Sequence, residues 1–562
     1  MADTLMQVVE EGIRLFNARK PLEARRALES AVKLDRKAVV AWTNLGVACV
    51  ALGDLDAARD AFRAAAGLEP DSADAQHGLG LVAMRVGDFE RAESYLGNAI
   101  RLSPVAGYFN NLSIVLRSLG RSDESDACLR KAVELAPHDA AMHSNQVLYL
   151  NYTHGDDGAR MRSEADAWAR RHADQLVERS RLDFPNRDAT RDRRLRVGYV
   201  SPDLRLHAVT FFLQPLLAAH DRAAVEVYCY SDSQVADDVT RRIRASADGW
   251  CEAHVFDDAA LARRILDDDV DILVDLAGHT GRNRLPMFAR RVAPVQVSYL
   301  GYLGTTGLRT MDHRFTDAIA DPVGATEEFS SEALERLPGG MFAYSGDRDV
   351  PIAAPPSSVA PFVTFGSFNH LQKITDATLT LWSRVMAGVA GSRLCIKAFG
   401  LAEEGQRDAV RRRFAALGGD VTRLVLLPPE DTVGAHLARY NDIDIALDTF
   451  PYNGITTTFE ALWMGVPVVT LAGHTQVSRF GASAVTHAGC AEFVAEGSDE
   501  FVAKAVALAR DSTRLGDLRR TLRDRMRAST LCDGPRLARG IEAAYRRMWL
   551  AWCDDVTPRR RA

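Results

Sequence analysis

The chain has 562 residues, which is too long for a single hydrophobic core and predicts roughly three or four domains. Its hydrophobic content of 47% and charged content of 26% are typical of a soluble globular protein. The net charge of −6 comes without a long basic stripe, so the composition disfavours a nucleic-acid-binding protein.

The N-terminal residues MADTLMQVVEEG contain no basic segment followed by an apolar core, so we expect no signal peptide. No apolar run approaches the roughly 18–20 residues needed to span a bilayer. The eight cysteines are scattered and form no CxxC pair, which indicates reduced thiols and argues against a cysteine-rich zinc site. Together these features predict a cytoplasmic protein.

A regular repeat dominates the first quarter of the chain, where glycine recurs every 34 residues at Gly12, Gly46 and Gly80. Other positions keep this spacing within a residue: Ala24, Ala58, Ala92 and Ser125, and Leu28, Phe62, Leu96 and Leu129. The sequence also predicts turns within the units at Gly53, Gly87 and Gly120, and unit ends at Pro70, Pro104 and Pro137. This pattern resembles the tetratricopeptide repeat, with about four units over residues 5–140. We expect residues 1–180 to form an all-α solenoid that ends in a degenerate unit or a capping helix.

Three asparagines, Asn44, Asn111 and Asn145, occupy the same position of successive repeats, with Gly78 interrupting the row. An asparagine amide offers both a donor and an acceptor, so such a ladder could bind the backbone of an extended polypeptide. The alternative is that these side chains are ordinary polar surface. A repeat region of this kind predicts a protein or peptide partner.

From Leu195 onward, apolar strands alternate with helical stretches such as Ala259–Asp268, which predicts a mostly parallel, doubly wound sheet. The predicted strands of this first series lie in LRVGYVSPDL, VEVYCYSDS, DILVDLAGHT and PVQVSYLGY. A Pro- and Ser-rich stretch, residues 347–361, is predicted to be a linker. A second series follows in FVTFGSFN, SRLCIKAFG, RLVLLPPE, DIDIALDTF and VPVVTL. We therefore expect two Rossmann-like halves, residues 190–346 and 362–550, with ligands at the carboxyl ends of their strands.

The segment Phe450–Leu471 is the most informative one for function. It follows a predicted strand that ends at Leu447-Asp448, and it places three threonines, Thr456 to Thr458, where a helix begins. These threonines are candidate caps beside unpaired backbone N–H groups, and a helix N-terminus binds phosphate readily. Glu460 follows one turn later, where its carboxylate could accept hydrogen bonds from sugar hydroxyls. The alternative is an ordinary capped helix of an α/β domain.

Four segments together resemble the O-linked N-acetylglucosaminyltransferase family: LRVGYVSPD, Ala293–Gly307, SFNHLQKI and PYNGITTTFEALWMGVPVV. The resemblance covers nearly the whole chain. Three details are closer to the plant SPINDLY-like and bacterial branch, namely Gly278-His279-Thr280, FTDAIADP and Glu460. The resemblance implies a tetratricopeptide solenoid followed by a glycosyltransferase B fold. It also implies an inverting transferase that needs no metal and moves a sugar from a nucleotide diphosphate to Ser or Thr hydroxyls of proteins.

The resemblance also implies roles for individual residues. Lys373 matches the family lysine on the nucleotide diphosphate, where a fixed ammonium stabilises the leaving group without a metal. His207 matches a histidine of the catalytic cleft and is a candidate base, and His279 at a strand end is a second cleft candidate. A hydrogen bond that merely orders a loop is the alternative for His279. The residues implied to bind the nucleotide sugar are His370, His436, Arg439, Asn453, Gly454, Thr456, Thr457 and Glu460.

Three positions depart from the family pattern. Ile455 replaces a polar residue, often histidine, His370 stands where glutamine is frequent, and Leu303 interrupts LGYPGTTG. The first two lie beside the expected donor, so the donor stays open between UDP-N-acetylglucosamine as first choice, GDP-fucose, and another activated sugar used on bacterial flagellin. A repeat scaffold with an inactive second half is the non-enzymatic alternative. The acidic strings Asp442-Ile-Asp444, expected within a strand, and Asp267–Asp271 suggest no metal site.

Overall fold

The computed structural model describes residues 2–18, 20–177, 184–346 and 350–561. Its chain divides into two compact units. The first consists of Met1–Pro137 and Phe399–Ala416, and the second consists of His138–Ala398 and Leu417–Ala562. The first is the repeat unit and the second is the sheet unit.

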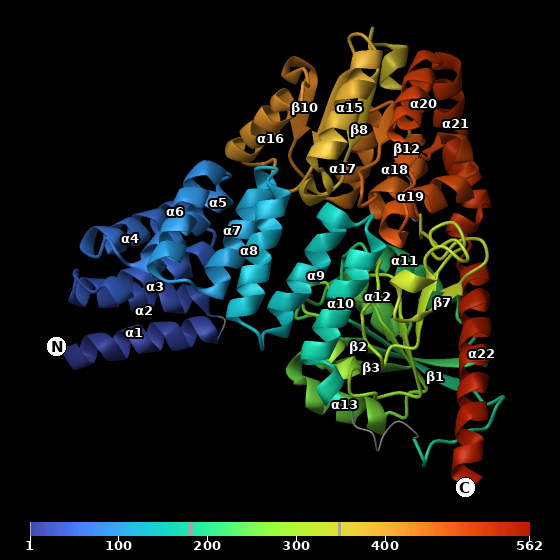
Figure 1. Ribbon diagram of the computed structural model, residues 1–562, viewed down its shortest axis with the longest axis horizontal. Helices are drawn as coiled ribbons and strands as arrows, with labels where there is room; N and C mark the ends of the chain where they lie inside the picture. The colour runs from blue at the N-terminus through green and yellow to red at the C-terminus, as the bar shows by residue number, and fades with distance from the viewer. Residues whose placement is uncertain (1, 19, 178–183, 347–349, 562) are drawn as a thin grey trace. The chain divides into compact units, whose positions relative to one another are not determined.

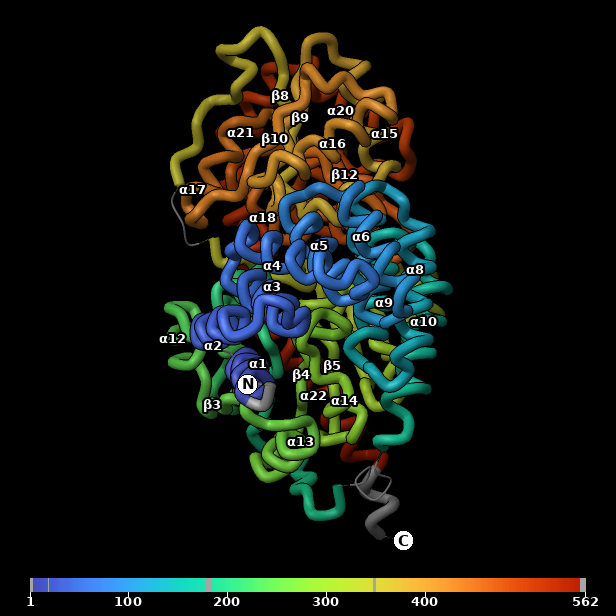
Figure 2. Tube along the Cα trace, turned by 90° about the vertical axis from the view of Figure 1, so that its left-hand side faces the viewer, coloured from blue at the N-terminus to red at the C-terminus, as the bar shows by residue number. Residues whose placement is uncertain are grey.

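The repeat unit is built from antiparallel helix pairs, which Figure 2 shows stacked in chain order. Its helices are α1 (Ala2–Asn17), α2 (Pro21–Leu34), α3 (Val39–Ala51), α4 (Leu55–Leu68), α5 (Ala73–Arg85), α6 (Phe89–Leu102), α7 (Ala106–Ser118) and α8 (Ser122–Leu135). A later helix, α16 (Glu404–Ala416), belongs to the same unit, where Arg412 forms an ion pair of 2.7 Å with Glu90.

The repeating small residues explain how closely the paired helices approach. A Cβ atom at Gly46 would lie 2.6 Å from the Phe62 ring, and one at Gly12 would lie 2.7 Å from Leu28. The predicted turn glycines have positive φ, for example +76° at Gly53, a conformation that side chains disfavour. The predicted repeats, their turns and the ends of the second helices are therefore confirmed.

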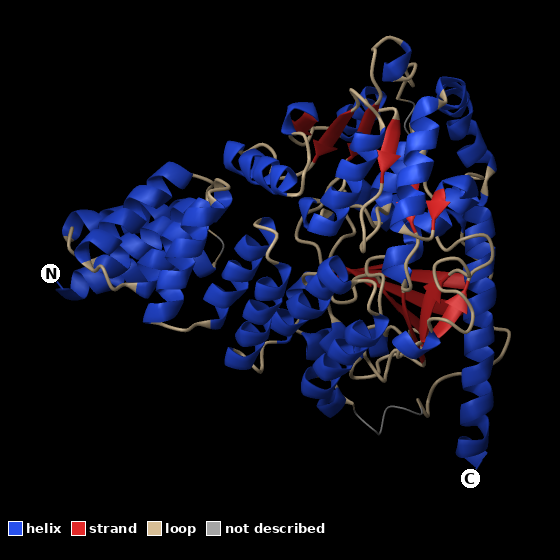
Figure 3. Cartoon of the chain, turned by 45° about the horizontal axis from the view of Figure 1, so that its top comes forward, coloured by secondary structure: helices blue, strands red, loops and turns tan. Residues whose placement is uncertain are grey.

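The sheet unit contains two parallel sheets, which Figure 3 shows as separate groups of strands. In the described residues the first has the order β3-β2-β1-β4-β5-β6-β7 and the second has the order β10-β9-β8-β11-β12-β13. The first sheet comprises β1 (Leu195–Ser201), β2 (Val225–Ser231), β3 (Gly249–Glu252), β4 (Ile272–Asp275), β5 (Val295–Ser298), β6 (His313–Thr316) and β7 (Ala333–Arg336). The second comprises β8 (Thr364–Ser367), β9 (Arg393–Lys397), β10 (Leu424–Leu427), β11 (Ile445–Leu447), β12 (Val468–Leu471) and β13 (Val494–Ala495). This confirms the predicted fold of a solenoid followed by two Rossmann-like halves.

Helices connect the strands in both halves. In the first half they are α11 (Thr210–Ala219), α12 (Asp238–Ala245), α13 (Asp258–Asp267) and α14 (Leu285–Phe288). In the second half they are α15 (Asp376–Gly388), α16, α17 (Val433–Ala438), α18 (Thr456–Trp463) and α19 (Gln476–His487), and the helices α20 (Ser498–Arg510) and α21 (Ser512–Ala528) follow the last strand, β13. Two further helices, α9 (Ala140–His154) and α10 (Gly158–His172), precede the first sheet and belong to the sheet unit.

The last helix, α22 (Gly534–Arg561), is the long red helix of Figure 1 and returns to the first half. The hydroxyl of Tyr545 lies 3.2 Å from that of Tyr199 on β1, and Glu542 lies 2.7 Å from His220. The C-terminal helix therefore packs on the first half, although the sequence analysis assigned residues 362–550 to the second.

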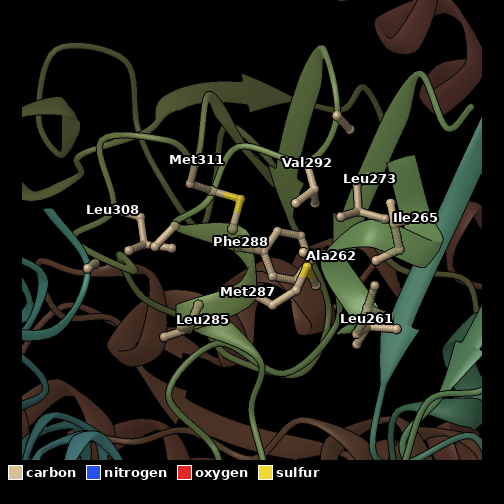
Figure 4. Packing of buried hydrophobic residues seen from close by; sticks show 14 of the residues in the cluster. Leu261, Ala262, Ile265, Leu273, Leu285, Met287, Phe288, Val292, Leu308 and Met311 are labelled. Atoms are coloured by element: carbon tan, nitrogen blue, oxygen red, sulfur yellow. The ribbon is translucent and has the colours of Figure 1, made fainter. Parts of the chain in front are cut away.

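Apolar side chains fill the space between the helices and the first sheet. Figure 4 shows Phe288 and Met287 of α14 beside Leu261 and Ile265 of α13, with Leu273 of β4 nearby. All five of these side chains are fully buried. This core fixes the strand ends from which the functional loops extend.

The predicted linker, residues 347–361, falls partly outside the described residues, since 347–349 are not described. From residue 350 to residue 361 the segment is irregular apart from the 3-10 helix Pro356–Ser358. The predicted solenoid of residues 1–180 likewise extends into residues 178–180, which are not described.

Candidate functional site

Both sheets reverse their strand order at one place, between β1 and β4 in the first and between β8 and β11 in the second. Ligands of such sheets bind at the carboxyl ends of the strands beside this switch point. His207 follows β1 and His279 follows β4, while Lys373 follows β8 and Asn453 follows β11. The fold alone therefore brings these candidate residues to the two binding edges.

The loop between β11 and α18 is rigidly built around Asp448. This buried carboxylate accepts hydrogen bonds from the backbone N–H of Gly454 at 2.7 Å and from the Thr470 hydroxyl at 2.7 Å. Burial raises the pKa of the Asp448 carboxyl to about 6 against these hydrogen bonds. Asn453 is fully buried, and its amide donates to the Thr449 carbonyl and accepts from the Gly481 N–H. Its side chain therefore shapes the loop, and its carbonyl is the group left to face the site.

Helix α18 begins at Thr456, as predicted, but its threonines do not cap it. The residue before the helix is Ile455, which provides no side-chain cap, so the prediction of threonine caps is wrong. Thr457 instead donates to the Asn369 amide oxygen at 2.9 Å, across to the loop that follows β8. Thr458 donates to the Gly454 carbonyl at 3.0 Å. The start of α18 therefore keeps backbone N–H groups available for an anion.

Lys373 lies against two consecutive residues of the β11–α18 loop. Its ammonium donates to the Asn453 carbonyl at 2.8 Å and lies 3.8 Å from the centroid of the Tyr452 ring. Burial lowers the pKa of the Lys373 ammonium to about 7, and the Asp448 carboxylate opposes this shift. A half-buried cation is thus held beside the N-terminus of α18, an arrangement suited to a diphosphate.

Four side chains form a second polar cluster next to this loop. His436 of α17 contacts the Lys397 ammonium through Nδ1, and its Nε2 lies 2.9 Å from a carboxylate oxygen of Glu460. Glu460 also accepts from the Tyr440 hydroxyl at 3.3 Å. Lys397 and Glu460 are buried, and burial lowers the pKa of Lys397. The structure thus joins His436 and Glu460, both predicted from the sequence, in a direct contact, and places Lys397, which was not predicted, on the other nitrogen of the His436 ring.

Two residues predicted to bind the nucleotide sugar, Arg439 and His370, make their hydrogen bonds outside the polar cluster of His436. Arg439 is exposed, and its guanidinium pairs with Glu430 at 2.5 Å and Asp442 at 3.2 Å. His370 is exposed and accepts from the Gln372 N–H at 3.3 Å. The expected strand position of Asp442 is wrong, because this residue ends a 3-10 helix, Arg439–Asp442, and β11 starts later.

In the first half, His207 lies in the loop between β1 and α11 with its side chain 38% exposed. Its Nδ1 lies 3.6 Å from the Asp203 carboxylate and 3.4 Å from the Val209 N–H. Burial lowers the pKa of His207, and the Asp203 carboxylate opposes the shift. A neutral imidazole that is open to solvent can accept a proton.

His279 is enclosed rather than open. It is fully buried, and its Nε2 lies 3.0 Å from the Thr306 carbonyl and its Nδ1 3.3 Å from the Ser144 hydroxyl. Burial lowers the pKa of His279 to about 3, so the ring is neutral. These contacts favour the loop-ordering alternative over contact with a substrate.

The three asparagines of the repeats are half-buried on α3, α7 and α9. The Asn44 amide donates to the Val40 carbonyl of its own helix at 2.8 Å, and the Asn111 amide lies 2.8 Å from His77 Nε2. Asn44 and Asn111 belong to the repeat unit, whereas Asn145 belongs to the sheet unit. Their proposed contact with a polypeptide stays a prediction.

Sequence reasoning missed Lys397, Asn369 and Tyr452. A signal existed for Lys397, because it is the last residue of the strand predicted from SRLCIKAFG and so sits at the ligand-binding edge. Asn369 and Tyr452 lie within the quoted motifs, but only the folded chain places them on Thr457 and Lys373.

The described residues contain neither a metal-binding cluster nor a membrane-spanning helix. No group of three or more His, Cys, Asp or Glu side chains there could hold a metal ion. Likewise, the helices in the described ranges include none with the length and apolar character needed to cross a membrane. Independence from metal remains a prediction.

Comparison with known proteins identifies both regions of the chain. The model of glycosyl transferase family 41 matches residues 161–349 and 358–540, and a tetratricopeptide repeat model matches residues 9–74 and 77–140. A solved structure described as a mutant O-GlcNAc transferase of Thermobaculum terrenum is 37% identical, with a TM-score of 0.81. The match covers 92% of this chain and 98% of that one.

Two plant proteins are also similar. The probable UDP-N-acetylglucosamine–peptide N-acetylglucosaminyltransferase SPINDLY of Oryza sativa subsp. japonica is 38% identical over 433 residues, covering 76% of this chain and 46% of the relative. The probable transferase SEC of Arabidopsis thaliana is 30% identical over 379 residues, covering 65% of this chain and 38% of the relative. The chain spans about half the length, or less, of these curated relatives.

Proposed function

Because the chain belongs to glycosyl transferase family 41, we propose that it is an inverting transferase that moves a sugar from a nucleoside diphosphate to Ser or Thr hydroxyls of proteins. The observation that carries this proposal is the Lys373 ammonium, held beside the N-terminus of α18 at the switch point of the second sheet. The similarity to an O-GlcNAc transferase over nearly the whole length of both chains supports it.

The diphosphate of the donor would lie between Lys373 and the first turn of α18. Both groups carry positive charge, and both are fixed before the donor binds, so little reorganisation is needed as charge develops. Thr456 would add a hydroxyl contact from the first residue of the helix, and Thr457 would add one only by leaving the Asn369 amide oxygen, to which its hydroxyl donates. Gly454 leaves room for the Thr457 hydroxyl, since a Cβ at residue 454 would lie 2.7 Å from it.

The transfer itself needs one bond to break and one to form. The acceptor hydroxyl oxygen attacks the anomeric carbon of the sugar, and the bond from that carbon to the β-phosphate oxygen breaks on the opposite side. The electron pair leaves with the nucleoside diphosphate, where Lys373 and the helix N-terminus stabilise its charge. His207 is the proposed acceptor of the hydroxyl proton, with Asp203 beside its Nδ1. His279 supports the neighbouring loop and takes no proton.

The nucleoside would lie toward the cluster of His436, Glu460 and Lys397. Within the part of the chain that the structure describes, the hydrogen bonds to Glu460 use Oε2, so its Oε1 is left for a ribose or sugar hydroxyl. Arg439 and His370 are exposed at the rim and would reach the nucleotide only by leaving their present contacts.

The first choice of donor is UDP-N-acetylglucosamine, because the names of the curated relatives include it. Ile455, immediately before α18, keeps GDP-fucose and other activated sugars as alternatives because it replaces a polar residue at the donor site. The proposed contacts to an extended polypeptide acceptor are Asn44, Asn111 and Asn145. We also expect the protein to act in the cytoplasm, and to need neither a cofactor nor a metal.

The test is a panel of nucleotide sugars offered to the purified chain together with a mixture of unfolded proteins. Intact-protein mass spectrometry should detect one donor-dependent mass increase on acceptor proteins, lost in Lys373→Met. Transfer from GDP-fucose but not from UDP-N-acetylglucosamine would show that the proposed donor is wrong and that the proposed reaction, sugar transfer to a protein hydroxyl, is right. No transfer and no binding of any nucleotide sugar would favour the repeat scaffold with an inactive second half.

A further inference from the structure

The segment between the two matched regions belongs to neither of them. The repeat model ends at residue 140 and the transferase model begins at residue 161, so helix α9 and the turn after it lie between the two. In the fold this intervening segment is part of the sheet unit. Its last residues, 151–156, make polar and aromatic contacts with both catalytic halves.

The first contact reaches the first half. Asn151 is buried at the end of α9, and its amide donates to the Tyr302 hydroxyl at 3.1 Å. Tyr302 is also buried, in the loop that follows β5. This hydrogen bond joins α9 to a strand end of the first sheet.

The second contact reaches the β11–α18 loop, which contacts the Lys373 side chain. The ring of Tyr152 stacks on the ring of Tyr452, with centroids 5.1 Å apart and an interplanar angle of 24°. The Tyr452 ring in turn lies 3.8 Å from the Lys373 ammonium. The Tyr452 ring therefore contacts both the Lys373 ammonium and the Tyr152 ring, and the intervening segment supplies Tyr152.

The third contact fixes the neighbouring helix. The Gly155 carbonyl accepts from the Thr475 hydroxyl, and Asp156 accepts from the Ser478 hydroxyl at 2.7 Å and pairs with His474 at 2.9 Å. These residues stand at the start of α19, where the Val477 carbonyl accepts from the Asn453 N–H at 3.1 Å. The turn after α9 therefore supports the β11–α18 loop indirectly, through the start of α19.

We propose that Tyr152 is a positioning residue for the Lys373 ammonium, acting through Tyr452, so that the segment between the repeats and the transferase region completes the donor site. A cation prefers the face of an aromatic ring, and stacking of Tyr152 on Tyr452 restricts how the Tyr452 ring can turn away from the Lys373 ammonium. The proposal deepens the proposed function and rests on it for the identity of the ligand.

The experiment compares the full chain with Tyr152→Leu, which removes the stacked ring, and Tyr152→Phe, which keeps it. Tyr95→Leu in the repeat unit is the matched control for loss of a tyrosine, and thermal unfolding reports whether each variant folds. UDP binding by titration calorimetry is measured at pH 6 and pH 8. The pH midpoint of Lys373 acylation, followed by peptide mass mapping without nucleotide, gives a second readout.

In Tyr152→Leu we expect UDP binding at pH 6 to weaken about two- to five-fold, since the cation loses its fixed aromatic contact. Water should also reach Lys373 when the Tyr452 ring is free to move. Because burial is what lowers the pKa of Lys373, the midpoint of acylation should rise and UDP binding should vary less between pH 6 and pH 8. Tyr152→Phe should restore the wild-type values, and Tyr95→Leu should leave them unchanged.

An unchanged acylation midpoint in a folded Tyr152→Leu variant would overturn the proposal, even if UDP binding weakened, since a general structural defect would explain the weakening. A wild-type chain that binds neither UDP nor GDP would contradict the proposed donor site instead. The acylation midpoints would then still decide whether Tyr152 positions Lys373.

Discussion

Replacing Lys373 by methionine should remove the charge that stabilises the leaving group while keeping all but the last atom of the unbranched side chain. The ammonium is fixed by the Asn453 carbonyl at 2.8 Å and the Tyr452 ring at 3.8 Å, so in the wild type no rearrangement has to precede reaction. A unit charge about 4 Å from a phosphate oxygen contributes about 4 kcal/mol at an effective dielectric constant of about 20. Loss of one preorganised donor reduces turnover by about 100–1000-fold. We expect Lys373→Met to fall in that range.

The lowered pKa of Lys373 should make the affinity for UDP depend on pH. The charged form of Lys373 is present below its pKa of about 7 and is lost as the pH rises through that value. If the ammonium form binds the donor, the affinity for UDP should drop about 15-fold from about pH 7 to about pH 8.5, in proportion to the protonated fraction. The drop should disappear in Lys373→Met.

Titration calorimetry with UDP and single-turnover transfer kinetics measure the two effects separately. Thermal unfolding is the control, and below about pH 7 the variant should be at least as stable as the wild type, because the buried cation and its desolvation penalty are gone. Near-normal turnover in the folded variant, or a UDP affinity in the wild type that is flat from pH 6 to pH 9, would refute the role given to Lys373.

Three further predictions concern the base, the metal and the repeats. His207→Ala should lower the single-turnover rate by about 100–10,000-fold at unchanged UDP affinity, and an unchanged rate would remove His207 as the base. Activity should survive EDTA, since Lys373 and the α18 N-terminus supply the positive charge, and restoration of a lost activity by Mg²⁺ or Mn²⁺ would contradict this. Combined Asn44→Ala, Asn111→Ala and Asn145→Ala should raise the acceptor KM at least several-fold at about 0.5–1.5 kcal/mol per lost amide contact. An unchanged acceptor KM would show these asparagines to be polar surface only.

The repeats and most strands were predictable because their signals are local. Gly46 contacts Phe62 within one helix pair, so the spacing in the sequence directly encodes the packing. The strands that sequence reasoning missed are short, polar or at an edge. β7, with the sequence ALER, is exposed to half-buried along its length, and β13 has two residues, so neither shows an apolar run.

The site was predictable where backbone topology decides the position, and unpredictable where side chains pair over long distances. Lys373 follows β8 at the switch point, and the fold carries it there. No local pattern tells that Lys397 meets His436, or that Tyr152 stacks on Tyr452 across 300 residues of chain. The burial of a side chain also depends on residues far away in the sequence, and the burial of His279 is what argues against its contact with a substrate.

The proposed function requires that a nucleoside diphosphate bind between Lys373 and the first turn of α18. The most direct measurement is UDP binding by titration calorimetry at pH 6.5 to the wild type and to Lys373→Met, with Lys504→Met as the control for loss of a lysine on α20. We expect UDP to bind the wild type and the control, and its affinity to fall at least ten-fold in Lys373→Met. Equal affinity in all three proteins would contradict that requirement.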